Sequence, residues 1–200
     1  MDDTMTKRQR QVAIAAGPVF LRQGFVRTTM GDIAAAAGLS RQGLYLAFPN
    51  KEAVFAAAVL VLTEQQDAEL EEGLCHIRGL RSRLIFVCER WLRGVFDLQR
   101  STPDARDMDD LIFPVVREVY RRFVARIALL IEVESGDALG AIAITDLARL
   151  LVFGIRGYSN SAKDGPDMRR LVELQVDLIV GHVEAAMRAR PVASKQKLRA

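Results

Sequence analysis

Cysteine, histidine and tryptophan are scarce in this chain of 200 residues, which has two cysteines, two histidines and one tryptophan. Cys75 and Cys88 are too few for a disulfide framework, and their spacing matches no zinc site. We therefore expect reduced thiols, no metal site and no cofactor. The sequence also lacks a phosphate-binding glycine loop, a zinc-hydrolase signature and a nucleophile elbow, so it predicts that the protein is not an enzyme.

Long apolar runs are also missing. Charged residues interrupt every apolar stretch before it reaches the length of a membrane-spanning helix, about 18 residues. The first residues, MDDTMTKRQRQ, are polar and do not form a secretory signal. We expect a soluble, cytoplasmic protein without a membrane partner.

Charge is unevenly distributed, although the net charge is only +3. Residues 1–52 contain seven basic and four acidic residues, and residues 111–200 contain fourteen basic and ten acidic residues. Residues 53–110 have the opposite balance, with eleven acids and seven arginines. Positive charge at the two ends of the chain is weak support for an anionic partner.

Strand patterns are nearly absent, whereas apolar residues recur at helical spacing along most of the chain. The sequence therefore predicts an all-α fold. Pro18 predicts a kink in the first helix, or a helix that is regular only from Pro18 onward, and Gly24 is expected to end it. The expected helices cover residues 8–23, 28–37, 41–48, 51 to beyond 68, 79–99, 104–112, 114–134, 138–160 and 167–190.

The segment TTMGDIAAAAGLSRQGLYLAFPNKE, residues 28–52, has the spacing of a helix-turn-helix. Ala34 and Gly38 are small enough for two helix backbones to approach closely. Gly38 can also adopt the left-handed conformation that ends a helix abruptly. Leu39 and Leu44 would fill the space between the two helices. The sequence thus predicts an N-terminal head of three helices that contains a helix-turn-helix.

The second helix of such a unit places its N-terminal residues at base edges in the DNA major groove. Arginine pairs well with guanine and glutamine with adenine, and a glycine lets the backbone come close. Tyrosine, lysine and threonine side chains at the flanks suit phosphate groups. The predicted DNA-binding residues are Thr28, Thr29, Ser40, Arg41, Gln42, Gly43, Tyr45 and Lys51. Short helices of this kind also occur as simple scaffold, and that alternative stays open.

The run GFVRTTMGDIAAAAGLSRQGLYLAFPNKEAVF resembles the DNA-binding domain of the TetR family of bacterial transcriptional regulators. Ala47 departs from the pattern, because the family often has histidine or tyrosine there, and Gly17-Pro18 replaces good helix formers. The resemblance implies a DNA-binding head over residues 1–51 and an antiparallel helical domain for ligand binding and dimerisation over residues 52–190. Residues 191–200 are predicted to form a flexible basic tail.

The resemblance also implies an effector pocket and a dimer interface in the helical domain. The candidate ligand-binding residues are aromatic: Trp91, Phe113, Tyr120 and Phe153. Aromatic residues at helical spacing also form ordinary core, so both interpretations stay open. Of the last two predicted helices, residues 167–190 are apolar on two faces, and Gly154 and Gly157 in residues 138–160 would permit close helix packing. The two helices are expected to form a homodimer as a four-helix bundle, with an intramolecular core as the alternative.

Together these features predict a ligand-responsive transcriptional repressor. A homodimer would bind a palindromic double-stranded DNA operator, and a small apolar or amphipathic effector would release it. The alternative is a helical dimer that binds a small molecule and has lost DNA binding, since the net charge is modest and Ala47 lacks a common DNA contact.

Overall fold

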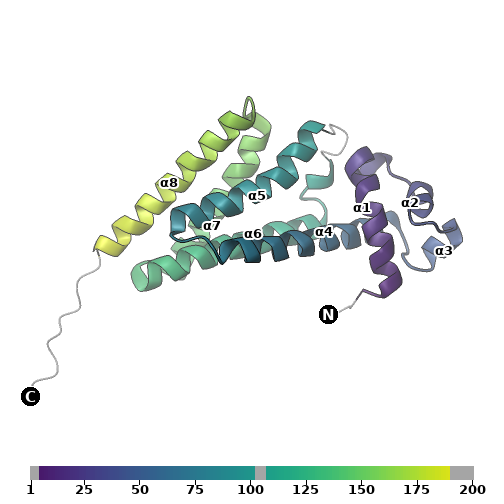
Figure 1. Ribbon diagram of the computed structural model, residues 1–200, viewed down its shortest axis with the longest axis horizontal. Helices are drawn as coiled ribbons and strands as arrows, with labels where there is room; N and C mark the ends of the chain where they lie inside the picture. The colour runs from purple at the N-terminus through teal and green to yellow at the C-terminus, as the bar shows by residue number, and fades with distance from the viewer. Residues whose placement is uncertain (1–4, 102–106, 190–200) are drawn as a thin grey trace, which may run out of the picture. The chain divides into compact units, whose positions relative to one another are not determined.

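The computed structural model describes residues 5–101 and 107–189, without the side chains of residues 93–101 and 159–160. These residues form helices and no strand, which confirms the predicted all-α fold (Figure 1). The tail predicted at residues 191–200 lies outside this part. The α-helices are α1 Lys7–Arg27, α2 Met30–Ala36, α3 Arg41–Tyr45, α4 Lys51–Leu74, α5 Leu80–Ser101, α6 Pro114–Ser135, α7 Ala141–Ser161 and α8 Gly165–Ala189.

Most of the predicted helices are confirmed with small changes at their ends, but the helix expected over residues 104–112 is wrong in its described part. Residues 107–109 form one 3-10 turn, and residues 110–113 are not helical. Two causes are visible. Pro114 disfavours a helical conformation in the residue before it. The carboxylate of Asp110 accepts a hydrogen bond from the Ile112 N–H, which competes with helical bonding.

Helix α1 begins at a capping box and is interrupted near its end. The Thr6 hydroxyl accepts a hydrogen bond from the Gln9 N–H, and the Gln9 side chain accepts one from the Thr6 N–H. The backbone is helical from Lys7 through Pro18, so a helix that is regular only from Pro18 is a wrong expectation. Gly24, with φ 77°, breaks the helix as expected, because this conformation favours glycine.

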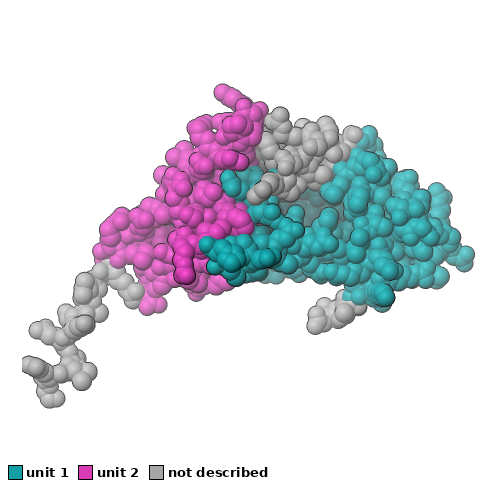
Figure 2. Space-filling model, in the orientation of Figure 1, with its two compact units in different colours: residues 1–76, 89–122 teal, residues 77–88, 123–200 magenta. Residues whose placement is uncertain are grey.

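The chain divides into two compact units (Figure 2). Unit 1 combines residues 1–76 with residues 89–122, and unit 2 combines residues 77–88 with residues 123–200. The three helices of the head therefore share one unit with α4. The boundary predicted at residue 51 separates functional regions, and it stays a prediction.

The core of the head is aromatic and aliphatic. Helix α1 packs against α4 and α2, and α2 packs against α3 (Figure 1). The rings of Phe20 and Phe55 are 5.2 Å apart in an edge-to-face arrangement, which is favourable for aromatic pairs. Ile33 and Leu44 are 0 % exposed. Burial of these side chains fixes α2 and α3 on the rest of unit 1.

In unit 2, α7 and α8 pack together. The Gln175 side chain lies against Gly154, where an added Cβ would come within 2.5 Å of the amide, and Gln175 Nε2 donates to the Leu150 carbonyl at 2.7 Å. Nothing lies within 4 Å of a Cβ added at Gly157. Of the two glycines, only Gly154 therefore allows the predicted close approach of α7 and α8 within this unit. Among the described residues, no helix combines the length and apolar character needed to cross a membrane.

Candidate nucleic-acid interface

A tight turn joins α2 to α3, as the helix-turn-helix prediction requires. The Leu39 N–H donates to the Ala34 carbonyl at 2.9 Å, and the Gly38 N–H donates to the Ala35 carbonyl at 3.2 Å. This pair of bonds is a Schellman motif, and it needs the positive φ of Gly38, which is 65°. A Cβ added at Gly38 would meet nothing within 4 Å, so the expectation of a close backbone contact at Gly38 is wrong. The backbone angle, and not crowding, explains this glycine.

Helix α3 presents its polar residues outward. The Ser40 hydroxyl caps it by accepting a hydrogen bond from the Gly43 N–H at 3.0 Å. Leu44 points into the core with 0 % exposure. Arg41 and Gln42 are exposed on the first turn, and Tyr45 is 54 % exposed on the last. The start of α3 therefore exposes a guanidinium and an amide, with Arg41 Nη2 lying beside Gly31 of α2, 2.7 Å from the position of an added Cβ.

Leu46 is 78 % exposed directly after α3, beside Tyr45, and the sequence analysis did not select it. An exposed leucine is common at protein surfaces. Next to an exposed arginine and glutamine, its side chain also has the chemistry to contact the methyl group of thymine. Leu46 therefore adds an apolar element to the outward face of the helix-turn-helix.

Two residues of α1 bind α3 and the turn that follows it, and neither was predicted from the sequence. Arg8 Nη2 donates to the Gly43 carbonyl at 3.1 Å, and Gln9 Nε2 donates to the Ala47 carbonyl at 3.1 Å. A Cβ added at Gly43 would lie 3.2 Å from Arg8 Nη2, so this glycine leaves room for the guanidinium. The capping box of Thr6 and Gln9 could have located the start of α1, but not these contacts.

The two predicted threonines differ in exposure. Thr28 is only 1 % exposed, and its hydroxyl donates to the Gly24 carbonyl at 2.6 Å. Thr29 is exposed, and its hydroxyl caps α2 by accepting from the Asp32 N–H. Hydrogen bonds from the Thr29 hydroxyl and N–H lower the pKa of Asp32 from its ordinary value, and the charge of Arg41 lowers it further. Thr28 stabilises the fold, whereas Thr29 remains at the surface.

The ammonium group of Lys51 binds the protein's own backbone. Nζ donates to the carbonyls of Phe25 at 2.7 Å and Val26 at 3.2 Å. It also lies 4.3 Å from the centroid of the Phe25 ring, a favourable cation–π distance. Lys51 was expected to contact a DNA phosphate. Its observed hydrogen bonds instead connect the start of α4 to the end of α1.

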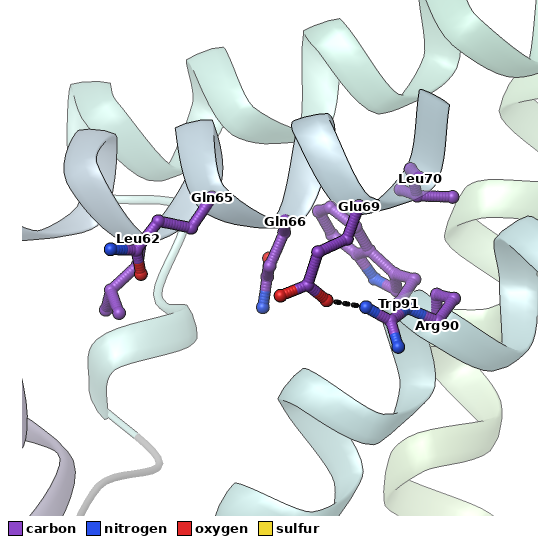
Figure 3. A pocket seen from close by; sticks show the side chains of 7 residues that line it. All are labelled: Leu62, Gln65, Gln66, Glu69, Leu70, Arg90 and Trp91. Atoms are coloured by element: carbon purple, nitrogen blue, oxygen red, sulfur yellow. Dashed lines mark ion pairs between the residues drawn. The ribbon is translucent and has the colours of Figure 1, made fainter. Parts of the chain in front are cut away.

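A pocket of about 320 Å³ lies between α4 and α5 within unit 1. Figure 3 shows Glu69 of α4 and Arg90 of α5 pointing toward each other as an ion pair. Leu70 and Trp91 provide apolar surface. The α4 residues of the lining follow the i, i+3, i+4 spacing of one helix face, a signal that the sequence analysis did not use. The lining residues are Leu62, Gln65, Gln66, Glu69, Leu70, Arg90 and Trp91.

The structure brings two of the four predicted ligand-binding residues together. Trp91 lines the pocket, and its ring lies 5.4 Å from the Tyr120 ring. Tyr120 is 3 % exposed and does not line the pocket, and its hydroxyl donates to the Asp109 carboxylate at 2.9 Å.

The other two predicted ligand-binding residues lie elsewhere. The Phe113 ring is 4.6 Å from the Phe25 ring and 4.9 Å from the Phe55 ring, in the aromatic cluster of the head. Phe153 belongs to α7 in unit 2 and is 43 % exposed. Neither lines the pocket between α4 and α5.

Neither cysteine contributes to this pocket. Cys88 is 0 % exposed, and Cys75 is exposed at the end of α4. Across the residues that the structure describes, no three His, Cys, Asp or Glu side chains are grouped so that they could hold a metal ion.

Comparison with known proteins gives a consistent result for the head. A family model described as "Bacterial regulatory proteins, tetR family" matches residues 15–58. An uncharacterized HTH-type transcriptional regulator of Bacillus subtilis (strain 168), YfiR, is 40 % identical over 110 residues, which are 54 % of this chain and 48 % of YfiR. The matched region therefore spans about half the length of that relative.

Solved structures share the fold along most of the chain. The transcriptional regulator FadR from Bacillus subtilis, determined in complex with stearoyl-CoA, is 19 % identical with a TM-score of 0.61 over 85 % of this chain and 96 % of FadR. A transcriptional regulator from Rhodococcus sp. Rha1 is 18 % identical with a TM-score of 0.65 over 93 % of this chain and 100 % of that protein. At these identities the likeness concerns the fold.

Proposed function

We propose that this chain, whose residues 15–58 match the tetR family of bacterial regulatory proteins, is a dimeric transcriptional repressor that a small molecule releases from its operator. The matching family and the relative are both described as regulators, and neither as an enzyme. A bacterial regulator of this kind would bind its operator in the cytoplasm.

The observation that carries this proposal is the outward presentation of Arg41 and Gln42 at the start of a capped and anchored α3. Ser40 caps this helix, Arg8 of α1 binds the Gly43 carbonyl within it, and Gln9 of α1 binds the Ala47 carbonyl just after it. A fixed helix with exposed polar groups at its N-terminus can enter the major groove, where arginine reads guanine and glutamine reads adenine. Arg41, Gln42 and Tyr45 are thus the proposed DNA-contacting side chains, with Thr29 at the flank.

Dimerisation is supported by the apolar surface of α7 and α8. Leu150, Phe153, Leu174 and Leu178 are 63 %, 43 %, 53 % and 69 % exposed in the single chain. Large exposed apolar side chains on neighbouring helices are typical of a protein–protein interface. A second copy of α7 and α8 would cover them and form a four-helix bundle. Two heads related by a two-fold axis would then read the two halves of a palindromic operator.

The pocket between α4 and α5 is the proposed effector site, and its lining suggests an amphipathic ligand with an anionic group. Leu62, Leu70 and Trp91 offer apolar contacts, and Arg90 is the only cation among the described residues of the lining. The side chain of Arg90 is 30 % exposed, whereas that of its partner Glu69 is 61 % exposed. Glu69 can therefore turn to solvent while a carboxylate or phosphate of the ligand replaces it on Arg90. FadR binds an amphipathic anion, stearoyl-CoA, which is compatible with this chemistry.

Selection of bound duplexes from a random DNA pool tests the proposed function. We expect a two-fold symmetric sequence with half-sites about one helical turn apart. Arg41→Ala should reduce discrimination at one base position by about 10-fold or more. Arg78→Ala is the matched control, because it removes the same charge from an exposed position outside the head. A protein that is dimeric and enriches no sequence would instead have lost DNA binding.

A further inference from the structure

The end of α1 is held by a carboxylate that lies far away in the sequence. Asp107 Oδ1 accepts a hydrogen bond from the Phe25 N–H at 2.9 Å, and Asp107 Oδ2 accepts one from the Val26 N–H at 2.6 Å. Gly24 breaks the helix immediately before these residues, so their N–H groups need partners outside the α-helical pattern. Both oxygens of one carboxylate meet this need.

The carbonyl groups of the same two residues are bound by an opposite charge. Lys51 Nζ donates to the carbonyls of Phe25 and Val26. A carboxylate on two N–H groups and an ammonium on two carbonyls hold this short backbone segment from both edges. Hydrogen bonds to charged groups are stronger than those between neutral groups. We call Asp107, Lys51 and the backbone of residues 25–26 the α1 clamp.

The α1 clamp lies next to the helix-turn-helix in the sequence. Thr28, two residues after Val26, donates to the Gly24 carbonyl, and Thr29 caps α2. The clamp therefore fixes the backbone from which the helix-turn-helix begins.

The segment that carries Asp107 also reaches the pocket. Asp109, two residues further on, accepts a hydrogen bond from the Tyr120 hydroxyl at 2.9 Å. The Tyr120 ring contacts the ring of Trp91, which lines the pocket. Phe113, in the same segment, contacts Phe25 itself. Side-chain contacts and the backbone of residues 107–113 thus connect the pocket wall with the start of the helix-turn-helix, entirely within unit 1.

We propose that Asp107 is a positioning residue that couples the pocket to the DNA-binding head through the α1 clamp. This inference rests on the proposed function for its DNA-binding part. Because coupling between two sites is reciprocal, DNA bound at the head must alter the pocket as much as a pocket ligand alters DNA binding. The coupling can therefore be measured without knowing the effector.

Hydrogen exchange tests the α1 clamp without DNA. In the wild-type protein, the amides of Phe25 and Val26 should be protected although they follow a helix break. In Asp107→Asn, the amide group offers one acceptor oxygen and one NH₂ group in place of two acceptors. Exchange at Phe25 and Val26 should then become about 10-fold faster or more, while the amides of Val54 and Phe55 in the core of α4 keep their protection. If the Phe25 and Val26 amides of the wild-type protein exchange without protection, the α1 clamp does not exist in solution.

The fluorescence of Trp91, the only tryptophan of the chain, tests the coupling. Addition of the selected operator DNA should change the Trp91 emission of the wild type, and random DNA at the same concentration should not. In Asp107→Asn this change should be lost at saturating operator, and operator affinity should fall by about 10-fold with an unchanged salt slope. An unchanged slope means that the phosphate contacts are retained, which general misfolding would not give.

Asp110→Asn is the matched control, because it removes the same charge three residues away. The Asp110 carboxylate bonds only within its own segment in the described contacts, to the Ile112 N–H, and asparagine can still accept that bond. It should behave as the wild type in both measurements. Operator affinity and a Trp91 response equal to wild type in Asp107→Asn would overturn the coupling. A wild-type protein that selects no DNA would refute the proposed function. Hydrogen exchange would still show whether Asp107 protects the Phe25 and Val26 amides.

Discussion

The helix-turn-helix and the α7–α8 pair differ in how far their apolar side chains are buried within the chain. In the head, Ile33 and Leu44 are 0 % exposed, and the first turn of α3 presents Arg41 and Gln42 to solvent. On α7 and α8, large apolar side chains such as Leu150 and Leu178 remain 63 % and 69 % exposed. The head has a buried apolar core and a polar surface. The α7–α8 pair buries apolar side chains between its helices but leaves other apolar side chains exposed on its outer face.

This difference indicates the kind of partner that each region accepts. A polar and cationic surface on a rigid helix suits a charged, hydrogen-bonding partner such as DNA. An apolar surface gains free energy mainly when another apolar surface covers it. Mutations should therefore separate the two regions: changes in the head should affect stability or DNA reading, and changes on the outer face of α7 and α8 should affect assembly.

The largest effect is expected from Phe20→Ala in the head. Phe20 is 0 % exposed and its ring contacts the rings of Phe25 and Phe55. Truncation should lower the free energy of unfolding by about 3–5 kcal/mol, because it removes buried apolar surface and leaves a cavity. Urea unfolding followed by circular dichroism measures this loss. Leu46→Ala, at a position 78 % exposed, is the control and should change stability by less than about 0.5 kcal/mol. Equal effects would mean that the core of the head is not the one described.

The double variant Leu174→Glu with Leu178→Glu should dissociate the proposed dimer. Each leucine would bury apolar surface on α8 in the four-helix bundle, and its loss should weaken the dimer by about 100-fold or more in total. Sedimentation equilibrium measures the dissociation constant. Leu129→Glu, on α6 and 57 % exposed, is the matched control and should leave the dimer intact. Dissociation by Leu129→Glu alone would move the interface away from α7 and α8.

A smaller effect is expected from Gly38→Ala at the turn of the helix-turn-helix. The φ of 65° is unfavourable for alanine, although the added methyl group meets no atom within 4 Å. The free energy of unfolding should fall by about 1–2 kcal/mol, which thermal unfolding can detect. Gly38→Asn should lose less, because asparagine tolerates this conformation better. If alanine and asparagine cost the same, steric crowding rather than backbone angle would explain the glycine.

The smallest effects concern the two glycines of α7. Gly157→Ala should stabilise the protein by about 0.5–1 kcal/mol, since alanine favours the helix and meets no atom within 4 Å. Gly154→Ala should give less than this gain, because the Gln175 amide must move and release the Leu150 carbonyl. Thermal unfolding of both variants in parallel measures the difference. A larger gain from Gly154→Ala would contradict the observed packing of Gln175.

The helix-turn-helix could be predicted from the sequence because its signals are local. Ser40 as a cap and Gly38 as a helix stop act on residues a few positions away, and both appear in the structure with these roles. The physical reason assigned to Gly38 was partly wrong, since sequence cannot separate a required backbone angle from a close contact. The exposed character of Arg41 and Gln42 followed from the burial of Leu44 on the opposite side of a short helix.

The contacts that position the site could not be predicted, because they join distant residues. Arg8 binds Gly43 across 35 positions, and Asp107 binds Phe25 across 82. Helical periodicity over residues 104–112 suggested a helix, but the carboxylates of Asp107 and Asp109 bind groups elsewhere, and that of Asp110 binds the Ile112 N–H. Likewise, Phe113 was expected to line a pocket because it is aromatic, but it packs in the core of the head. A polar or aromatic side chain reveals its chemistry in the sequence, but not its partner.

Titration of the selected operator with wild-type protein and Arg41→Ala, repeated at several salt concentrations, tests the central claim most directly. For the wild type, the logarithm of the binding constant should fall linearly with the logarithm of salt concentration, and one substituted base pair should weaken binding by about 1–3 kcal/mol. In Arg41→Ala that base preference should disappear while other positions keep theirs. Full base discrimination in Arg41→Ala would contradict the assignment of α3 as the helix that reads the DNA.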